Sequence, residues 1–340
     1  MRSFASDNNA SVHPLVMEAI VAANTDHAVG YGDDVWTAEA TKKMKEVFGE
    51  EADPYFVFNG TGANTIALQA ITRPFNSIIC AQTAHIYVDE CGAPGRLTGC
   101  SVVAVNTPDG KLTPELIKPE LKEFGFCHHS QPKAIYISQV TEMGTIYTLD
   151  EVRAIADLAH RYGMYLHMDG ARLANACAYL NCSMKAITVD SGVDILSFGG
   201  TKNGMMIGEA VVAFKPEIAK DLQYYRKQTT QLASKLRYLS AQFIPYLEND
   251  LWLENAKKAN EKALRLAEAL KKFSQIKFTQ KIESNQLFFT MPLVVARKLA
   301  EKYFFYFWNE EQGECRFVTS WDTTDEDLAG IMTEISKLLV

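Results

Sequence analysis

One lysine of the sequence lies among glycines, directly after a short apolar run. Residues 197–204 read Ser-Phe-Gly-Gly-Thr-Lys-Asn-Gly, and Lys202 is the only cation among them. Glycines let a bulky ligand approach the backbone, and a lysine amine with a lowered pKa can attack a carbonyl group to form an imine. An isolated Gly-Thr-Lys is more often a surface turn, because lysines are mostly exposed. Other residues must therefore decide between a reactive amine and a turn.

A carboxylate and an arginine follow another apolar run. Asp169 and Arg172 come directly after residues 164–168, and open α/β sheets bind ligands at the C-terminal ends of their strands. An aspartate before a glycine is by itself more often a turn former. Beside an imine-forming lysine, such a carboxylate can keep a pyridine nitrogen protonated, which makes the ring of pyridoxal 5′-phosphate (PLP) an electron sink. Lys202 and Asp169 together predict a PLP site.

A glycine-rich turn offers a place for the phosphate group. Gly60, Thr61 and Gly62 lie between a predicted strand at residues 55–58 and a helical pattern at residues 65–71. Free backbone N–H groups at a helix start bind phosphate, although a bare Gly-x-Gly is also typical of a tight strand-to-helix turn. The turn lacks the Gly-x-Gly-x-x-Gly spacing of dinucleotide-binding proteins. A nicotinamide-dependent dehydrogenase is therefore the less favoured alternative.

A histidine follows the next predicted strand, at residues 77–81. The ring of His85 can lie on a pyridine ring and hold it flat, and an imidazole transfers protons near neutral pH. A histidine beside isoleucine and tyrosine is on its own more often structural. The glycine turn, His85, Asp169 and Lys202 each come at the end of a successive strand. This order favours one common site for all of them.

Short apolar runs alternate with amphipathic segments from residue 36 to residue 215. This is the pattern of β-α units that build a largely parallel sheet with helices on both faces. Four further strands complete a predicted set of seven, and these are residues 101–105, 134–138, 195–198 and 210–214. We therefore predict an α/β fold with a mostly parallel seven-stranded sheet in its large domain.

The pattern changes after residue 214. Long helical patterns at residues 216–250 and 252–273 precede a smaller α+β unit. The predicted elements of this unit are strands at residues 286–290, 304–308 and 316–319 and a terminal helix from Asp325. We place the large PLP-binding domain at residues 1–245, including the N-terminal segment, and the small C-terminal domain at residues 246–340.

The composition indicates an ordinary globular protein that acts on small molecules. Its 340 residues are 47% hydrophobic, which is enough for a large core. A net charge of −7 without a long basic run argues against a nucleic-acid partner. With no signal-peptide pattern and no run of about 18 apolar residues, we expect a cytoplasmic protein that does not enter a membrane. Seven scattered cysteines without Cys-x-x-Cys spacing predict neither disulfides nor a metal site.

The motifs resemble those of the low-specificity L-threonine aldolases, in the threonine aldolase and β-eliminating lyase family of fold type I PLP enzymes. The similar segments run along nearly the whole chain. They are residues 4–7, 31–34, 59–64, 85–86 with Glu90, 139–145, 167–172, 200–202 and 316–319. The resemblance implies the aspartate aminotransferase fold, an amino acid substrate, and a homodimer or homotetramer.

The resemblance also implies roles for the residues around the cofactor. Lys202 would hold PLP as a Schiff base, Asp169 would pair with the pyridine nitrogen, and His85 would stack on the ring. The phosphate would be held by Gly60, Thr61 and Thr201.

A substrate clamp is implied as well. Ser6, Arg172 and Arg316 match the positions that grip the α-carboxylate of the amino acid, a task suited to the planar fork of arginine. The simpler alternatives are a helix cap for Ser6 and surface ion pairs for the two arginines. Because Arg172 follows Asp169 so closely, we count it among the cofactor-binding residues too.

Two features leave alternatives open. A second histidine that lies near the substrate hydroxyl in many family members corresponds here to either His128 or His129, and both can instead be exposed loop residues. The lysine segment also differs from the Ser-Lys-Gly-Leu form found elsewhere in the family, which leaves the substrate preference open. Candidates for reaching the cofactor of a neighbouring subunit are Tyr31 and the basic pairs Arg226 with Lys227 and Lys235 with Arg237.

The expected reaction is the aldol cleavage of a β-hydroxy-α-amino acid, such as L-threonine or L-allo-threonine, to glycine and an aldehyde such as acetaldehyde. His85, or a water that it holds, is the candidate base for the β-hydroxyl proton. A β-eliminating lyase, a phenylserine aldolase and an aminotransferase are alternatives on the same fold, and a non-catalytic PLP-binding protein is a further one.

Overall fold

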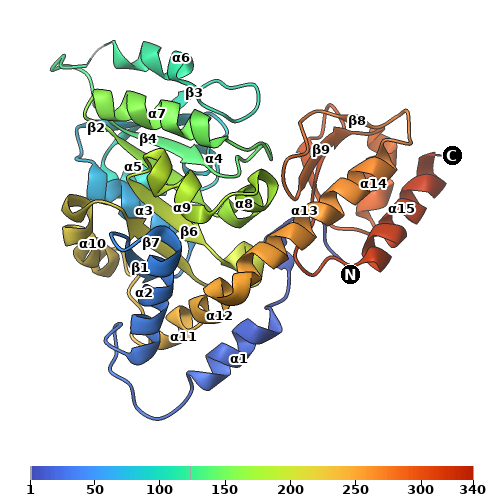
Figure 1. Cartoon of the computed structure of the whole chain (residues 1–340). Helices are drawn as coiled ribbons and strands as arrows, with labels where there is room; N and C mark the ends of the chain where they lie inside the picture. Colours follow the sequence, from blue (N-terminus) through green and yellow to red (C-terminus); the bar gives the residue numbers. More distant parts are fainter. Residues whose placement is uncertain (1, 123, 340) are drawn as a thin grey trace.

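A seven-stranded sheet forms the centre of the larger part of the molecule (Figure 1). The computed structural model describes residues 2–122 and 124–339. The strand order is β1-β7-β6-β5-β4-β2-β3, and β2 to β6 are parallel to one another. Strand β7 is antiparallel to both β1 and β6. The prediction of a mostly parallel seven-stranded sheet is thereby confirmed.

The strands of this sheet lie at the predicted positions, with ends that differ by up to three residues. Their bounds are β1 Asp53–Val57, β2 Asn76–Ala81, β3 Ser101–Val105, β4 Gln131–Ser138, β5 Tyr165–Gly170, β6 Ile195–Gly199 and β7 Glu209–Ala213. Every residue of β2, β6 and β7 is buried. Such strands are mostly apolar because helices cover both of their sides.

The helices around the large sheet form two layers (Figure 1). They are α1 Pro14–Ala22, α2 Val35–Phe48, α3 Gly60–Ile71, α4 His85–Val88, α5 Ala93–Thr98, α6 Pro114–Ile117, α7 Leu149–Arg161, α8 Leu173–Leu180, α9 Met184–Ile187, α10 Pro216–Gln228, α11 Arg237–Ser240 and α12 Phe243–Leu247. Helices α3 and α10 bury Ala63, Ile66 and Leu222 against one face. The other face is covered by a layer that includes α2, α7, α8 and α12.

A second, antiparallel sheet of four strands forms the smaller part of the molecule. Its order is β10-β11-β9-β8, with β8 Lys277–Phe278, β9 Gln286–Thr290, β10 Tyr306–Asn309 and β11 Glu314–Val318. Helices α13 Leu251–Leu270, α14 Leu293–Ala300 and α15 Asp325–Leu339 pack on one of its faces. Side chains alternate along a strand. Phe317 of β11 therefore points into this core, whereas Arg316 points to the opposite face.

Helix α13 joins the two cores. Its first half buries Trp252 and Ala256 in the core of the large sheet, and its second half buries Leu266 and Leu270 in the core of the small one. Figure 1 shows this helix running from the large sheet to the small one. One continuous helix thus sets the distance between the two sheets. The division at residues 245 and 246 stays a prediction.

The N-terminal segment lies beside the small sheet. The backbone N–H of Phe4 donates to Phe304 O at 2.7 Å, and Val318 N–H donates to Phe4 O at 2.8 Å. The strand predicted at residues 304–308 begins two residues later than predicted, because its regular pairing with β11 starts at Tyr306. The N-terminal segment also reaches the face of the small sheet that bears Arg316, whose side chain donates a hydrogen bond to Ala5 O.

The helical pattern predicted at residues 216–250 is interrupted, so a single helix over this range is wrong. Thr230 follows α10 with a φ of 63°. Gln231 then turns back and accepts a hydrogen bond from the backbone at the end of β1, at 3.0 Å. Asn249 and Asp250, with φ of 52° and 57°, separate α12 from α13. These breaks depend on tertiary contacts that local periodicity does not contain.

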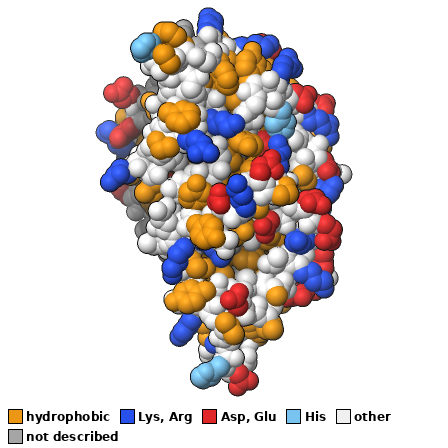
Figure 2. Space-filling model, turned by 90° about the vertical axis from the view of Figure 1, so that its left-hand side faces the viewer, with side chains coloured by type: hydrophobic (Ala, Val, Ile, Leu, Met, Phe, Trp, Pro, Cys, Tyr) orange, Lys and Arg blue, Asp and Glu red, His pale blue; other side chains and the backbone are white. Residues whose placement is uncertain are grey.

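The surface mixes side chains of all kinds. Figure 2 shows basic, acidic and hydrophobic side chains interspersed over one side of the molecule. Within residues 2–122 and 124–339, none of the helices has the length and apolar character needed to cross a bilayer.

Candidate active site

A cavity of about 450 Å³ lies where the C-terminal ends of the large-sheet strands face β10 and β11. Its size is in the usual range for small-molecule sites. Three parts of the chain line it, and the residues are Ser6 and Asn8, then His85, Asp89, Glu142, Arg172 and Lys202, then Tyr306, Phe307, Trp308 and Arg316. Five of the predicted site residues line this cavity, and they are Ser6, His85, Arg172, Lys202 and Arg316.

Lys202 stands in a tight 3₁₀ turn, Thr201–Asn203, directly after β6. Burial, and then the charge of Arg172, lower the pKa of its amine. Among the described residues its Nζ has neither a hydrogen bond nor an ion pair. Asn203 anchors the turn, because its Nδ2 donates to Tyr246 Oη at 2.9 Å and to Trp252 O at 2.8 Å. A fixed amine with a lowered pKa is a good nucleophile toward a carbonyl group.

Asp169 ends β5 and is buried. Its Oδ2 accepts hydrogen bonds from Tyr136 Oη at 2.7 Å and Asn64 Nδ2 at 2.9 Å, and its Oδ1 accepts one from Ala171 N–H at 2.9 Å. Burial by itself would raise the pKa of Asp169, but the bonds from Tyr136 and Asn64, together with the charges of Lys202 and His85, leave this pKa below its ordinary value. Asp169 is therefore a permanent negative charge beside the cavity.

His85 begins α4 and forms part of the cavity wall. Its Nδ1 lies 2.8 Å from Glu90 Oε1, which also accepts a hydrogen bond from Asn64 Nδ2 at 2.8 Å. Its backbone N–H donates to Glu142 Oε1 at 2.8 Å. The bond with Glu90 is the main reason that the pKa of His85 is raised. Since Nδ1 is taken by Glu90, Nε2 is the ring nitrogen left for proton transfer.

Four polar residues of this network were not predicted to have roles. Asn64, Glu90 and Glu142 lie inside the recognised motifs, while Tyr136 looked like an ordinary residue of a buried strand. Asn64, Glu90 and Tyr136 are buried, and Glu142 is half-buried. A polar side chain at a core position is the sequence signal that could have marked Asn64, because α3 also buries Ala63, Ile66 and Ala67.

The predicted phosphate residues lie at a helix start and at the lysine turn, and none of them lines the cavity. Asn59 caps α3 and accepts a hydrogen bond from Gly62 N–H at 2.8 Å, so Gly60 and Thr61 form the first turn. A Cβ atom at Gly62 would lie 2.4 Å from Gln231 Cδ, which explains the glycine. The Thr201 hydroxyl accepts a hydrogen bond from Gly208 N–H at 3.2 Å.

The predicted carboxylate clamp comes together at the cavity, but its two arginines differ. Arg172 forms a two-pronged pair with Asp7, through Nε to Oδ2 at 2.7 Å and Nη2 to Oδ1 at 2.8 Å. Within the described residues, Arg316 donates to Ala5 O alone, at 3.2 Å. Burial, and then the charge of Arg172, lower the pKa of Arg316 to about 10. Ser6 Oγ accepts a hydrogen bond from Asn8 N–H at 3.1 Å.

Neither histidine of the open alternative lines the cavity. His128 and His129 are exposed, and the ring of Phe126 lies 5.2 Å from one and 5.0 Å from the other. The exposed-loop interpretation therefore describes both of them.

The residues at the cavity fit PLP. The half-buried Lys202 amine, which has no hydrogen bond or ion pair within the described residues, can bond its aldehyde carbon, and a buried ionised carboxylate can face its pyridine nitrogen. The start of α3 is tied to this carboxylate through Asn64, which suits a phosphate at the helix end. The site therefore has a suitable group for each part of the cofactor.

Comparison with known proteins agrees with this geometry. The sequence profile of the family described as Beta-eliminating lyase matches residues 3–291. The low specificity L-threonine aldolase of Pseudomonas aeruginosa is 40% identical over 341 residues, covering 99% of this chain and 98% of that protein. The corresponding protein of a Pseudomonas species is 37% identical, with 99% and 98% covered.

Solved structures agree in fold. The threonine aldolase of Leishmania major has a TM-score of 0.94 at 30% identity, with 100% of both chains covered. An alanine–glyoxylate aminotransferase of a Nostoc species, at 15% identity, has a TM-score of 0.73 and covers 100% of this chain and 96% of its own. The second likeness concerns the fold alone, and it is the predicted aspartate aminotransferase fold of type I PLP enzymes.

Proposed function

This chain belongs to the β-eliminating lyase family, and from this premise we propose that it is a PLP-dependent lyase that cleaves L-threonine or L-allo-threonine to glycine and acetaldehyde. One observation carries the proposal. Lys202, with its lowered pKa, shares a 450 Å³ cavity with two arginines that can bind a carboxylate. An amine for the cofactor and cations for an amino acid are the minimum for such a reaction.

The chain's own residues hold and orient the reacting groups. When bound, PLP supplies an electron sink for the pair released as the Cα–Cβ bond breaks. Lys202 would hold the cofactor, Asp169 would keep the ring nitrogen protonated, and the His85 ring would pack on the cofactor ring. Gly60, Thr61 and Thr201 would hold the phosphate, and Ser6, Arg172 and Arg316 would bind the α-carboxylate. These assignments rest on the fit of each group to its neighbours described above.

His85 takes the proton of the β-hydroxyl group in this proposal. Glu90 holds Nδ1 at 2.8 Å, which leaves Nε2 as acceptor, and the ring forms part of the cavity wall. Loss of this proton lets the hydroxyl oxygen become the aldehyde oxygen as the Cα–Cβ bond breaks. Proton return to Cα then gives glycine.

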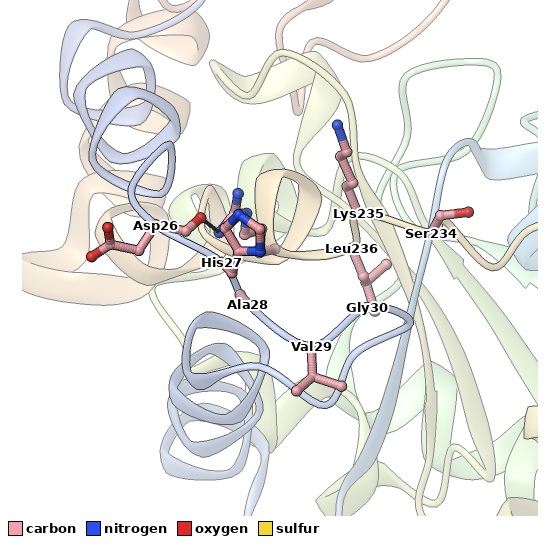
Figure 3. Close-up of a pocket in the computed structure, with 9 residues that line it drawn as sticks. Asp26, His27, Ala28, Val29, Gly30, Ser234, Lys235 and Leu236 are labelled. Carbon is pink, nitrogen blue, oxygen red and sulfur yellow. Dashed lines mark hydrogen bonds between the residues drawn. The ribbon is translucent and has the colours of Figure 1, made fainter.

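A homo-oligomer is the proposed assembly, and α1 together with the loop after it supports the proposal. Leu15, Val21 and Val29 are exposed there. Figure 3 shows residues 26–30 and 234–236 around a pocket. The volume of this pocket is about 320 Å³. Exposed apolar groups that cluster mark interaction surfaces. Light scattering during gel filtration tests the assembly, and a monomer at micromolar concentration would contradict it.

The function is tested with L-threonine and L-allo-threonine added separately to PLP-loaded protein. Acetaldehyde is followed through an NADH-dependent reductase, and glycine is quantified. Equal amounts of both are expected, with none from Lys202→Ala and normal amounts from the surface control Lys185→Ala. Keto acid instead of aldehyde would point to β-elimination or transamination, and benzaldehyde from phenylserine alone to a phenylserine aldolase. Colourless protein would overturn the PLP assignment.

A further inference from the structure

Arg316 lies between two aromatic rings on the cavity face of the small sheet. Its strand partner in β10 is Tyr306, and the rings of Tyr306 and Trp308 lie 5.3 and 5.2 Å from its guanidinium carbon. All three residues line the cavity. A cation above an aromatic face within about 6 Å is attracted by the negative charge of the ring face. The rings therefore stabilise Arg316 in the position it has.

The strand geometry brings Trp308 to this place. Pairing between β10 and β11 shifts between Phe307 and Asn309, which leaves Trp308 as the extra residue of a bulge. A bulge re-aims a side chain out of the regular alternation. The ring of Phe288 meets that of Trp308 edge-on, with centroids 5.1 Å apart and planes at 82°. Trp308 is thus supported from the neighbouring strand β9.

The two arginines of the cavity are held by different kinds of contact. Asp7 occupies two donor atoms of Arg172. Arg316 has one hydrogen bond, and its Nε is buried without a hydrogen-bond partner among the described residues. Aromatic faces fix the plane of a guanidinium without using its N–H groups. Most N–H groups of Arg316 consequently remain available for a ligand. Within the described residues, no carboxylate forms an ion pair with Arg316.

We propose that Tyr306 and Trp308 are positioning residues that hold the Arg316 guanidinium flat, so that its unused N–H groups receive the α-carboxylate of the amino acid. This inference rests on the proposed function and adds the device that aims its carboxylate clamp. A pre-oriented guanidinium loses less conformational entropy when a ligand binds. The aromatic pair therefore acts on substrate affinity and leaves the bond-breaking step unaffected.

The first test separates binding from chemistry. Trp308→Leu and Tyr306→Leu should each raise KM for the β-hydroxy amino acid, and Kd for glycine, by about fivefold with kcat nearly unchanged. Glycine has the carboxylate but no β-substituent, so its Kd reports the clamp alone. Trp308→Phe should largely restore both constants. The matched control is Tyr224→Leu, because Tyr224 is an exposed tyrosine of α10 (66% against 45% for Tyr306) that does not line the cavity.

The second test asks whether the rings act through Arg316. In an Arg316→Ala background, Trp308→Leu should change the Kd for glycine no further. An unchanged fivefold effect in that background would overturn the proposal, because the ring would then contact the ligand directly. Unaltered affinity in both single Leu variants would overturn it equally.

Failure of the proposed function gives a different pattern. Glycine binding is read from the absorbance of the bound cofactor, whatever reaction the protein catalyses. A wild-type protein that binds glycine but releases no aldehyde contradicts the aldolase and still tests the rings. If the wild-type protein binds no amino acid, both the proposed carboxylate clamp and the proposed role of the two rings are wrong.

Discussion

On the large-sheet side of the cavity Asp169 accepts three hydrogen bonds, whereas on the small-sheet side Arg316 donates one. The Asp169 carboxylate is fixed by donors from three different parts of the chain, so the protein itself already provides its hydrogen bonds. Arg316 is fixed by ring faces and keeps its donors unused. A group that serves a permanently bound cofactor gains from such a saturated shell, while a group that must bind and release substrate gains from unused donors. The large-sheet side of the cavity is thus suited to a cofactor that stays bound, and the small-sheet side to a substrate that binds and is released.

The largest expected effect concerns stability and compares the two arginines directly. Arg172→Ala leaves the buried carboxylate of Asp7 without its charged partner, so the free energy of unfolding should fall by about 3 to 5 kcal/mol. Arg316→Ala removes one hydrogen bond and should cost only about 1 kcal/mol. Urea unfolding of both variants at neutral pH measures the difference. Equal losses of stability would contradict the contrast between Arg172, which is ion-paired with Asp7, and Arg316, which has a single hydrogen bond.

Asp169→Asn tests the large-sheet side of the cavity through its effect on the catalytic rate. The substitution keeps the shape of the side chain but removes the charge that holds the cofactor ring protonated, so kcat should fall on the order of 100-fold. Tyr136→Phe removes one of the three hydrogen bonds and keeps the charge, and it should cost about tenfold at most. Steady-state rates with the PLP-loaded variants give both values. A Tyr136→Phe effect as large as that of Asp169→Asn would mean that the shell, and not the charge, matters.

One carboxyl on the large-sheet side is an exception to this saturation. Glu209 of β7 is buried over Gly199, where a Cβ atom would lie 2.4 Å from its Oε2. It forms no ion pair within the described part of the chain. Burial is the main cause that raises its pKa from 4.5 to about 7. The unfolded chain therefore releases this proton at a lower pH than the folded protein does.

Glu209 thus makes stability depend on pH. Between about pH 4.5 and 7 the unfolded state holds fewer protons than the folded state does. The contribution of Glu209 to the free energy of unfolding is therefore largest below pH 4.5 and is lost as the pH rises through 7. Glu209→Gln should remove this decline, which is on the order of 2 kcal/mol between pH 5 and pH 8. Urea unfolding at the two pH values measures it. A variant with the same pH dependence as the wild type would show that Glu209 is ionised throughout.

The contrast between the two sides also separates what could be predicted from sequence. Lys202, Asp169 and His85 follow apolar strands, and strand ends meet at one sheet edge, so their proximity followed from the pattern. Strand β3 has the predicted bounds. The Asp7–Arg172 pair joins residues 165 positions apart and has no local signal. Likewise, the aromatic faces at Arg316 depend on a strand register and a bulge that periodicity does not contain.

The helical segment at residues 216–250 was mispredicted for a related reason. Gln231 leaves the helical path to bond the backbone at the end of β1, beside the start of α3. Helix propensity is a weak signal, and a tertiary hydrogen bond to a buried N–H group overrides it. The break thus lies where the chain supports the predicted phosphate end of the site.

The smallest expected effect is a shift of the pH profile. Glu90 is the main cause of the raised pKa of His85, and the ring can accept a proton only when it is neutral. Activity should therefore be lost as the pH falls through the pKa of His85. Glu90→Gln keeps an oxygen for Nδ1 but removes the charge, so the acid limb of kcat/KM should move to lower pH while the alkaline plateau changes little. Glu90→Ala also loses the orientation and should lower the plateau as well. An acid limb that stays in place in Glu90→Gln would show that His85 is not the group that accepts the hydroxyl proton, and the large-sheet side would then orient the cofactor alone.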